Sequence, residues 1–318
     1  MEYSLVCVSP SRQAAVARML ERLFSLTPLS QPRPDRGIEI VIHDSPEDLV
    51  SGEVVFDAPG LCAIRTVHGY HLRSGASFLA LDLRSGRAAG SLSGAFMDLP
   101  LEEQRGLFLF AFLLLLSERG LYGLHAGGVW RDGCGFLLVG GSGSGKTTLT
   151  CALTRCGWQY LSDDTVLLKR APSGVKALAF GRPFHCASAT FRHFPELARG
   201  AHSPVCGKHL VDVGPVYPGR FRSRFRPRVI LFPEIAGTRS SRLIPLDSSA
   251  TLLGLLGRGA GLLHNRDSMA AQVAILGNLA KSARGFRLLH GDDVHSDPLS
   301  LSVLLRKGDH IDAMYSAA

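Results

Sequence analysis

The segment that most constrains the fold is Gly140–Thr148, which reads GGSGSGKTT. It follows the apolar run Gly135–Val139 and precedes Leu149–Arg155, which favours a helix. Glycines allow successive backbone N–H groups to point into one concavity, and the first turn of a helix adds further donors. The spacing fits the pattern G-x-x-x-x-G-K-[ST]. The sequence therefore predicts a strand, a loop that binds phosphate through its main chain, and a helix.

The side chains of this segment predict a nucleotide with its metal ion. Lys146 would reach the β- and γ-phosphates, and the Thr147 hydroxyl would ligate the Mg²⁺ that accompanies them. We therefore expect ATP and Mg²⁺ as cofactors. The residues expected to contact the nucleotide are Gly140, Gly141, Ser142, Gly143, Ser144, Gly145, Lys146, Thr147 and Thr148.

The composition is that of a globular protein with one large domain or two smaller ones. Of the 318 residues, 46% are hydrophobic and 19% are charged. The net charge of +8 favours anionic partners without distinguishing nucleotide, acidic peptide and nucleic acid. The seven cysteines include no C-x-x-C pair, a pattern typical of a reduced chain rather than a disulfide framework or zinc site. We expect a cytoplasmic protein.

The most apolar stretch is Leu107–Leu116. As a helix it would extend only about 15 Å, half the thickness of a bilayer core, and charged residues flank it closely. No basic and then apolar leader precedes Val6, so we expect no secretory signal. The stretch predicts a buried core helix and no membrane span.

Two domains are expected, because the pattern changes near Leu99. Residues 1–98 favour a small α+β domain with an antiparallel meander, and residues 99–318 favour an α/β domain that contains the glycine-rich segment. The first domain is expected to contain a helix at Ser11–Leu23 and strands at Tyr3–Val8, Ile38–Ile42, Glu53–Phe56, Cys62–Val67, Tyr70–Arg73 and Phe78–Leu83. The second is expected to contain helices at Ser248–Leu256, Asp267–Ala283 and Leu299–Lys307, and strands at Val229–Phe232 and Phe286–Leu289.

An acidic pair follows the glycine-rich segment closely. Asp163 and Asp164 come 17 positions after Lys146. A helix of about ten residues, ended by Gly157, followed by a returning strand, would bring both carboxylates back beside the loop. One carboxylate can hold Mg²⁺ and the other can accept a proton from an attacking hydroxyl, although the sequence does not assign the roles. The alternative is an acidic turn that caps the next segment.

A histidine is expected on the same rim. His125 precedes Val129, which can form a hairpin with Phe136–Val139 around Arg131–Gly133. In that position His125 can orient the carboxylate base or neutralise charge on a transferring phosphoryl group. The alternative is a purely structural histidine.

Together these motifs resemble the catalytic core of HPr kinase/phosphorylase, a family that shares a fold with phosphoenolpyruvate carboxykinase. The resemblance covers about Leu124–Leu168. It implies a mixed β-sheet, a loop that binds ATP phosphates, and Thr147 on Mg²⁺. It also implies that Asp163 and Asp164 supply a metal ligand and a general base for a serine hydroxyl, assisted by His125. Relatives form oligomers, so a homo-oligomer is one state that the resemblance implies.

One departure from that family concerns the substrate. HPr kinases carry a Glu-x-Arg-Gly-x-Gly segment after the acidic pair, whereas this chain reads Ala179–Phe184 without the glutamate. This departure puts in question both HPr as substrate and the reverse dephosphorylation. The chain looks more like divergent relatives associated with peptide natural products, including kinases that phosphorylate a serine of lasso-peptide precursors.

A second cationic feature is Arg220–Arg228, where five arginines are interleaved with two phenylalanines. The run can grip phosphate, an acidic peptide or single-stranded nucleic acid, or it can be an edge strand with its arginines in solvent. Because Arg226 and Arg228 precede the expected strand Val229–Phe232, we expect Arg226 to stabilise the transferring phosphoryl group. No recognisable nucleic-acid module accompanies the run, so nucleic acid is not the expected partner.

These observations favour an ATP-dependent kinase that phosphorylates a hydroxyl, a serine on an acidic or serine-bearing peptide or small protein. The alternative is a non-catalytic binding module in which ATP orders Arg220–Arg228 for a partner. A transport ATPase is disfavoured, because no Leu-Ser-Gly-Gly-Gln motif follows the loop and the acidic pair comes too early.

Overall fold

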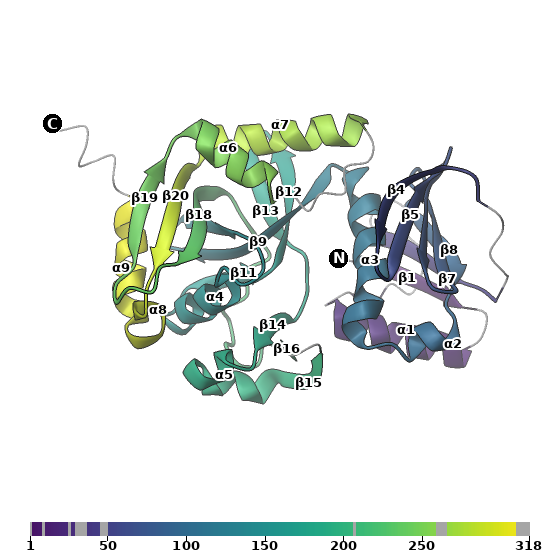
Figure 1. The fold of residues 1–318 in the computed structure, drawn as a ribbon, viewed down its shortest axis with the longest axis horizontal. Coiled ribbons are helices and arrows are strands. Elements are labelled where there is room, and N and C mark those ends of the chain that lie inside the picture. Colours follow the sequence, from purple (N-terminus) through teal and green to yellow (C-terminus); the bar gives the residue numbers. More distant parts are fainter. Residues whose placement is uncertain are drawn as a thin grey trace. The chain divides into compact units, whose positions relative to one another are not determined.

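The computed structural model describes residues 2–7, 10–24, 27–28, 37–44, 50–205, 208–258 and 266–309. The chain forms two compact units (Figure 1). Each unit combines helices with a mixed β-sheet, so the fold is mixed α/β. The first unit comprises Met1–Leu121 with Gly181–Pro183 and Leu262–Met269, and the second comprises Tyr122–Phe180, Phe184–Gly261 and Ala270–Ala318.

The first unit is built on one sheet with the strand order β2-β1-β3-β8-β7-β6-β5-β4. Its strands are β1 (Glu2–Cys7), β2 (Thr27–Pro28), β3 (Gly37–Ile42), β4 (Glu53–Ala58), β5 (Leu61–Arg65), β6 (Gly69–Ser74), β7 (Ser77–Asp82) and β8 (Arg87–Ser91). Its helices are α1 (Pro10–Leu23), α2 (Gly94–Met97) and α3 (Leu101–Ser117). The predicted strand at Tyr3–Val8 and helix at Ser11–Leu23 are therefore confirmed, apart from Val8, which lies outside the described residues.

The expected meander is only part of this sheet. Strands β4 to β8 pair successively in antiparallel fashion, as predicted. Strand β3, however, pairs in parallel with both β1 and β8, so the expectation of an antiparallel partner for Ile38–Ile42 was wrong. Helix α1 follows β1 and provides the long connection that parallel pairing requires. The period of apolar residues along a strand does not distinguish the two directions of pairing.

The apolar helix α3 belongs to the first unit. We expected the second domain to begin near Leu99, so this boundary lies about one helix later in the chain. Helix α3 belongs to this unit because its aromatic side chains pack there. Phe112 packs against Phe24, and Phe110 packs against Phe56, each with ring centroids 5.1 Å apart. The predicted buried core helix at Leu107–Leu116 is confirmed. Among the described residues no helix is both long and apolar enough to cross a membrane.

The second unit contains the larger sheet, with the strand order β17-β13-β12-β9-β10-β18-β20-β19 and β11 paired to β9. The strands are β9 (Leu121–Arg131), β10 (Cys134–Val139), β11 (Gln159–Ser162), β12 (Thr165–Ala171), β13 (Gly174–Ala179), β17 (Arg224–Phe225), β18 (Pro227–Ile235), β19 (Arg242–Leu246) and β20 (Arg284–His290). Strands β10, β18 and β20 run parallel. A small sheet of β14 (Phe184–Ala187), β16 (Lys208–Val211) and β15 (Ala201–Val205) lies beside it.

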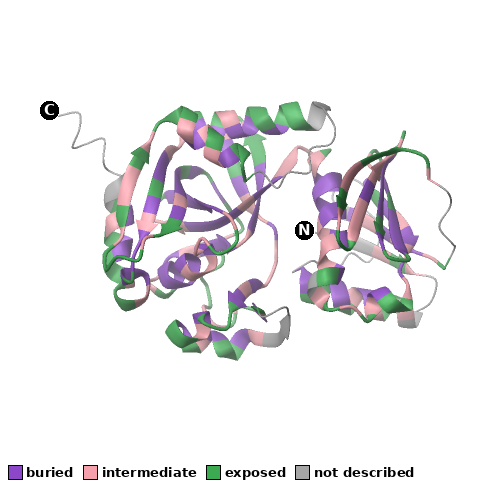
Figure 2. Cartoon of the chain, in the orientation of Figure 1, coloured by how far each residue is buried: buried purple, intermediate pink, exposed green. Residues whose placement is uncertain are grey.

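Helices cover both faces of the larger sheet (Figure 1). On one face, Phe136 and Leu138 of β10 pack with α4 (Lys146–Arg155) and α9 (Pro298–Asp309). On the other, Leu137 and Val139 pack with α6 (Ser248–Leu256) and α7 (Arg266–Ser282). The central strands are accordingly buried on both sides (Figure 2). The remaining helical turns are α5 (Thr190–His193), η1 (Pro195–Gly200) and α8 (Asp293–Ser296).

The predicted elements of this unit are confirmed to within a few residues. The helix predicted at Ser248–Leu256 has those bounds, because the Asp247 side chain caps it by accepting a hydrogen bond of 2.7 Å from the backbone N–H of Ala250. The other two helices and the two strands correspond to α7, α9, β18 and β20. The six cysteines in the described part of the chain carry free thiols.

The hydrogen bonds at the end of α4 explain why the chain turns back toward the sheet soon after the glycine-rich segment. The backbone N–H of Trp158 donates to the Leu153 carbonyl at 3.1 Å, and that of Gly157 donates to Thr154 at 3.0 Å. Gly157 has φ +90°, and these bonds form a Schellman motif, as the predicted glycine cap requires. We expect Gly157→Ala to lower the free energy of unfolding by about 1–2 kcal/mol, because a side chain at positive φ is strained. Urea unfolding measures this change.

The matched control is another glycine-to-alanine change in the same unit. Gly277 lies within α7, and a Cβ there meets no atom within 4 Å. Gly277→Ala should therefore raise the free energy of unfolding by up to about 1 kcal/mol. Equal stability of Gly157→Ala and the wild type would contradict the left-handed cap.

Candidate active site

The site begins with the β9–β10 hairpin, which confirms the predicted turn. Asp132 and Gly133 have φ +49° and +86°, and the strands pair from Arg131 with Cys134 to Ala126 with Val139. Two left-handed residues suit the tight turn of a twisted hairpin. His125 therefore lies one residue beyond the last pair, where β10 leads into the glycine-rich segment. We call Gly140–Thr148 the glycine loop.

The glycine loop turns sharply into α4. Gly143 and Gly145 have φ +82° and +89°, and the helix starts at Lys146. A Cβ on Gly145 would come within 2.6 Å of Nε2 of His290, which itself lies 3.1 Å from the Ser144 carbonyl oxygen. Both the positive φ and this close approach require glycine at position 145. The open N-terminus of α4 thus faces the site with its backbone donors.

Lys146 is folded against the loop. Its side chain is only 6% exposed, and Nζ donates to the carbonyl oxygens of Gly140 and Gly141 at 2.8 Å each. Nζ also lies 3.1 Å from Nε2 of His125. Burial lowers the pKa of Lys146, and the charges of Asp164 and Asp163 partly oppose that effect. Because the Lys146 ammonium group is the donor, Nε2 of His125 is the acceptor. A neutral His125 ring therefore carries its proton on Nδ1.

The two aspartates have different partners. Oδ1 of Asp164 lies 3.1 Å from Nδ1 of His125, which completes a chain from Lys146 through His125 to Asp164. Asp163 is 1% exposed, and its Oδ2 accepts hydrogen bonds from the Thr147 hydroxyl at 2.8 Å and from the backbone N–H of His185 at 3.2 Å. The predicted residues His125, Lys146, Thr147, Asp163 and Asp164 therefore lie together, in two separately bonded groups.

The turn that carries the aspartates is fixed by its own hydrogen bonds. The Ser162 hydroxyl accepts from the backbone N–H groups of Asp164 at 3.3 Å and Thr165 at 3.2 Å. Oδ2 of Asp164 also accepts from the Thr165 hydroxyl at 3.1 Å. These bonds hold the Asp164 carboxylate in one orientation, with Oδ1 directed to His125.

The donor set fits a magnesium ion carried by a nucleotide. Nowhere in the described ranges do three or more His, Cys, Asp or Glu side chains converge to form a metal cluster. Mg²⁺ bound with phosphates requires only one or two carboxylates, since phosphate and water oxygens complete its octahedron. The hydroxyl of Thr147 and the buried carboxylate of Asp163 are such oxygen donors, 2.8 Å apart at the helix start.

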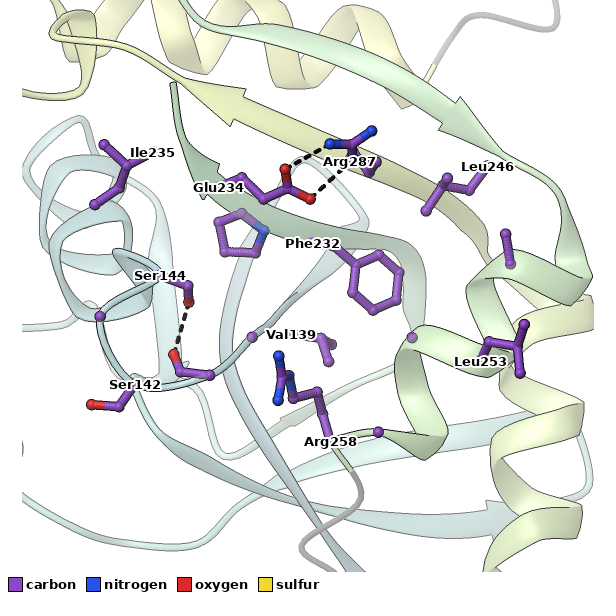
Figure 3. Close-up of a pocket in the computed structure, with 17 residues that line it drawn as sticks. Val139, Ser142, Ser144, Phe232, Glu234, Ile235, Leu246, Leu253, Arg258 and Arg287 are labelled. Carbon is purple, nitrogen blue, oxygen red and sulfur yellow. Dashed lines mark hydrogen bonds and ion pairs between the residues drawn. The ribbon is translucent and has the colours of Figure 1, made fainter. Parts of the chain in front are cut away.

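A cavity of about 770 Å³ adjoins the glycine loop on the side of β18 and α6 (Figure 3). Phe232, Leu246 and Leu253 give it apolar walls. At its rim Arg287 makes two hydrogen bonds to Glu234, of 2.7 and 2.9 Å. This volume is in the range of cavities that enclose a small organic ligand. The cavity offers space for a small organic group beside the glycine loop.

The structure adds a cation that the sequence analysis missed. Arg258 follows α6, lines the cavity, and its guanidinium lies 3.5 to 3.7 Å from where a Cβ on Gly141 would be (Figure 3). The Arg258 carbonyl oxygen accepts a hydrogen bond of 3.1 Å from the His125 backbone N–H. No local motif marks Arg258, because only the folding of α6 brings it to the loop.

The structure does not bring Arg226 together with these residues. Strand β18 runs parallel to β10, and its first residue, Pro227, pairs with Gly135 at the start of β10. The glycine loop follows the other end of β10, so Arg226 lies about 15 Å from it along the sheet. The residues of β18 that do reach the cavity are at its carboxyl end, Phe232 to Ile235. Ligands of parallel sheets bind at that edge.

His290 gives this region a pH-dependent stability. Burial lowers its pKa, although its hydrogen bond to the Ser144 carbonyl and the charge of Asp293 act in the opposite direction. The unfolded pKa is about 6.5, so the folded state binds fewer protons below that pH. The stability present above about pH 6.5 is therefore lost as pH falls through the lower folded value.

We expect His290→Asn to flatten the dependence of melting temperature on pH below about pH 6.5. The remaining slope should come partly from His295, whose pKa is also lowered by burial and by His193. His68→Asn, which removes an exposed histidine of the first unit, is the control. An unchanged slope in the His290 variant would contradict this assignment.

Comparison with known proteins gives distant structural likenesses only. No protein-family model matches the chain, and no curated protein matches it. Among solved structures, the HPr(Ser) kinase/phosphatase from Coxiella burnetii aligns with 61% of this chain and 94% of its own, at 16% sequence identity. The TM-score of that alignment is 0.33.

Proposed function

We propose that this chain is a Mg²⁺-ATP-dependent kinase that transfers a phosphoryl group to a serine hydroxyl of a peptide or small protein. One observation carries the proposal: His125 joins Lys146 to Asp164 at the glycine loop, while Thr147 is bonded separately to Asp163. A phosphoryl-transfer site needs a phosphate cradle, a metal position and a base beside the acceptor. This arrangement offers a distinct group for each requirement.

The glycine loop would bind the phosphates of ATP through its backbone N–H groups. Lys146 would exchange its two carbonyl partners for phosphate oxygens. The negative charge of these oxygens would stabilise the buried ammonium group. Arg258 would add a second positive charge on the cavity side of the loop. The apolar walls of the cavity would hold the nucleoside.

Thr147 and Asp163 would hold the Mg²⁺ ion, which when bound neutralises charge on the β- and γ-phosphates. Their hydrogen bond places both oxygens at the start of α4, where the phosphates would lie. The buried Asp163 carboxylate is then compensated by the metal and by the N–H of His185. This assignment leaves Asp164 free of the metal.

Asp164 would act as the general base. The acceptor oxygen forms a bond to the γ-phosphorus, the bond from that phosphorus to the β,γ-bridging oxygen breaks, and the acceptor proton passes to an oxygen of Asp164. His125 would orient Asp164 through Nδ1 and would remain held by Lys146 through Nε2. The products are a phosphorylated hydroxyl and ADP.

Mass spectrometry tests the proposal. The protein is incubated with Mg²⁺-ATP and serine-containing peptides, including the small peptides encoded beside its gene, and the products are searched for added phosphate. We expect one phosphorylated serine that disappears with Lys146→Ala. Tight ATP binding without any phosphorylated peptide, protein or small hydroxyl compound would overturn the kinase and favour the nucleotide-gated binding module.

A further inference from the structure

The solvent side of β12 and β13 carries a charge arrangement that does not stabilise the fold. Lys169 of β12 lies directly opposite Lys176 of β13 in the antiparallel pair, and both side chains are exposed. Two like charges at directly opposite positions repel and destabilise a sheet. An anion placed between them would remove that cost.

The same solvent side continues into the arginine run. Arg224 pairs with Leu178 and the buried Phe225 pairs with Ala177, so exposed and buried residues alternate there. Arg226 and Arg228 continue the exposed series, separated by the buried Pro227. Strand β17 is at the end of the strand order, so Arg224 stands at a sheet edge. Arg226 extends to the turn between β12 and β13, where its guanidinium lies 3.6 Å from where a Cβ on Gly174 would be, and Arg228 lies at the start of β18. We call the five exposed residues Lys169, Lys176, Arg224, Arg226 and Arg228 the basic face.

The charges of the basic face are not compensated within the described part of the chain. No carboxylate there forms an ion pair with any of its five residues, in contrast to Arg155 with Glu196 and Arg287 with Glu234. The other arginines of the run are already engaged: Arg220 donates to the Gly157 carbonyl at 2.8 Å. Arg222 stacks 3.8 Å from the centre of the Trp130 ring. The basic face therefore presents positive charge to a partner.

We propose that the basic face binds an acidic segment of the peptide that the site phosphorylates. This inference rests on the proposed function. Exposed side chains on one side of a strand repeat about every 7 Å, which is also the spacing of alternate carboxylates on an extended peptide. Guanidinium groups bind carboxylates through two parallel hydrogen bonds. The peptide would thus be recognised at a place separate from its reacting hydroxyl.

The aromatic residues favour a peptide over single-stranded nucleic acid. Nucleic-acid grooves combine positive charge with open aromatic rings on which bases stack. Here Arg222 already covers the Trp130 ring, and Phe225 is buried. Phe221, 52% exposed, alone does not form a series of stacking platforms.

The strand geometry sets the position of the acidic segment. Lys169 follows Asp164 by five positions along β12, a path of about 17 Å. An extended peptide advances at most about 3.3–3.6 Å per residue. The acidic residues should therefore be separated from the phosphorylated serine by five residues or more.

Fluorescence anisotropy of a labelled probe tests the inference without ATP. The probe is a ten-residue peptide of alternating glutamate and glycine, compared with a lysine–glycine peptide and with oligothymidine of equal charge. We expect Lys169→Glu and Arg226→Glu each to lower the affinity for the glutamate probe about tenfold, and the controls Arg199→Glu and Arg239→Glu each to change that affinity less than about twofold. The control residues are exposed arginines elsewhere in the second unit.

Each outcome of the binding test supports or overturns the inference about the basic face. No binding of the glutamate probe above the lysine probe, or equal losses in control and test variants, would overturn the inference. Tighter binding of oligothymidine with the same sensitivity to the variants would overturn it in favour of nucleic acid. Lys169→Glu places opposite charges across β12 and β13, so its melting temperature should not fall, which separates lost binding from misfolding.

The test also separates this inference from the proposed function. The Lys146→Ala variant should bind the glutamate probe with unchanged affinity, since binding to the basic face requires no nucleotide. Intact, variant-sensitive binding together with no phosphorylation of any peptide would support the basic face and overturn the kinase. If phosphorylation is found, the basic-face variants should raise KM for acidic peptides about tenfold and leave kcat unchanged.

Discussion

Replacement of Lys146 by alanine is expected to remove measurable phosphoryl transfer and to weaken ATP binding by about two orders of magnitude or more. The ammonium group is buried beside the loop, where a low dielectric strengthens its attraction to phosphate. It is also the group to which His125 is bonded, so its loss affects the general base as well. Calorimetric titration with ATP and a phosphorylation assay measure the two effects.

Two further variants make this result specific. Lys146→Met retains most of the side-chain volume and should lose ATP affinity to a similar extent, which separates the lost charge from a cavity in the loop. Arg226→Ala removes an exposed arginine at the far end of β18 and should leave ATP affinity within about twofold of the wild type. Normal ATP affinity in Lys146→Ala would mean that the glycine loop does not bind the nucleotide.

Asp164→Asn is expected to lower kcat by a factor of about 10²–10⁴ and to leave ATP affinity unchanged. The amide keeps the size of the side chain but cannot accept a proton in the transition state. Asp163→Asn should instead raise the Mg²⁺ concentration needed for half-maximal rate, because it removes a charged ligand beside Thr147. Steady-state rates at several Mg²⁺ concentrations distinguish the two variants.

The assignment of the two aspartates depends on this difference. His125→Gln should lower kcat less than Asp164→Asn does, because His125 acts by orienting Asp164. If Asp164→Asn instead changes the Mg²⁺ requirement and Asp163→Asn does not, the roles are reversed. If both variants keep near-normal rates, neither carboxylate is the base.

The part of the site that sequence predicts best is the part built from one continuous segment. The turn after β9, the glycine loop and the cap at Gly157 are each specified by residues that tolerate positive φ. These turns fix where β10 ends and where the chain returns, so Asp163 and Asp164 could be placed beside the loop from their spacing. His125 could be placed for the same reason.

The residues that the sequence does not reveal come from separate elements. Phe232, Arg258 and His290 belong to β18, the end of α6 and β20, and only the order of strands in the sheet brings them to the loop. Arg226 was expected there because the sequence marks the start of β18 but not its direction relative to β10. Had the parallel pairing been known, the carboxyl end of β18 would have been the expected side.

The two tryptophans of the chain provide optical reporters for different events. Trp158 is fully buried after α4, packs edge-on against Phe136 at 5.1 Å and donates from Nε1 to the Ser302 hydroxyl at 2.8 Å. Its emission should shift to longer wavelength only when the core around α4 and α9 opens to water. Trp130 lies instead beneath the guanidinium of Arg222, next to the basic face, so its emission should respond when an anion draws that arginine away. Trp158→Phe and Trp130→Phe would then yield single-tryptophan proteins, one that reports binding and one that reports unfolding, without an attached dye.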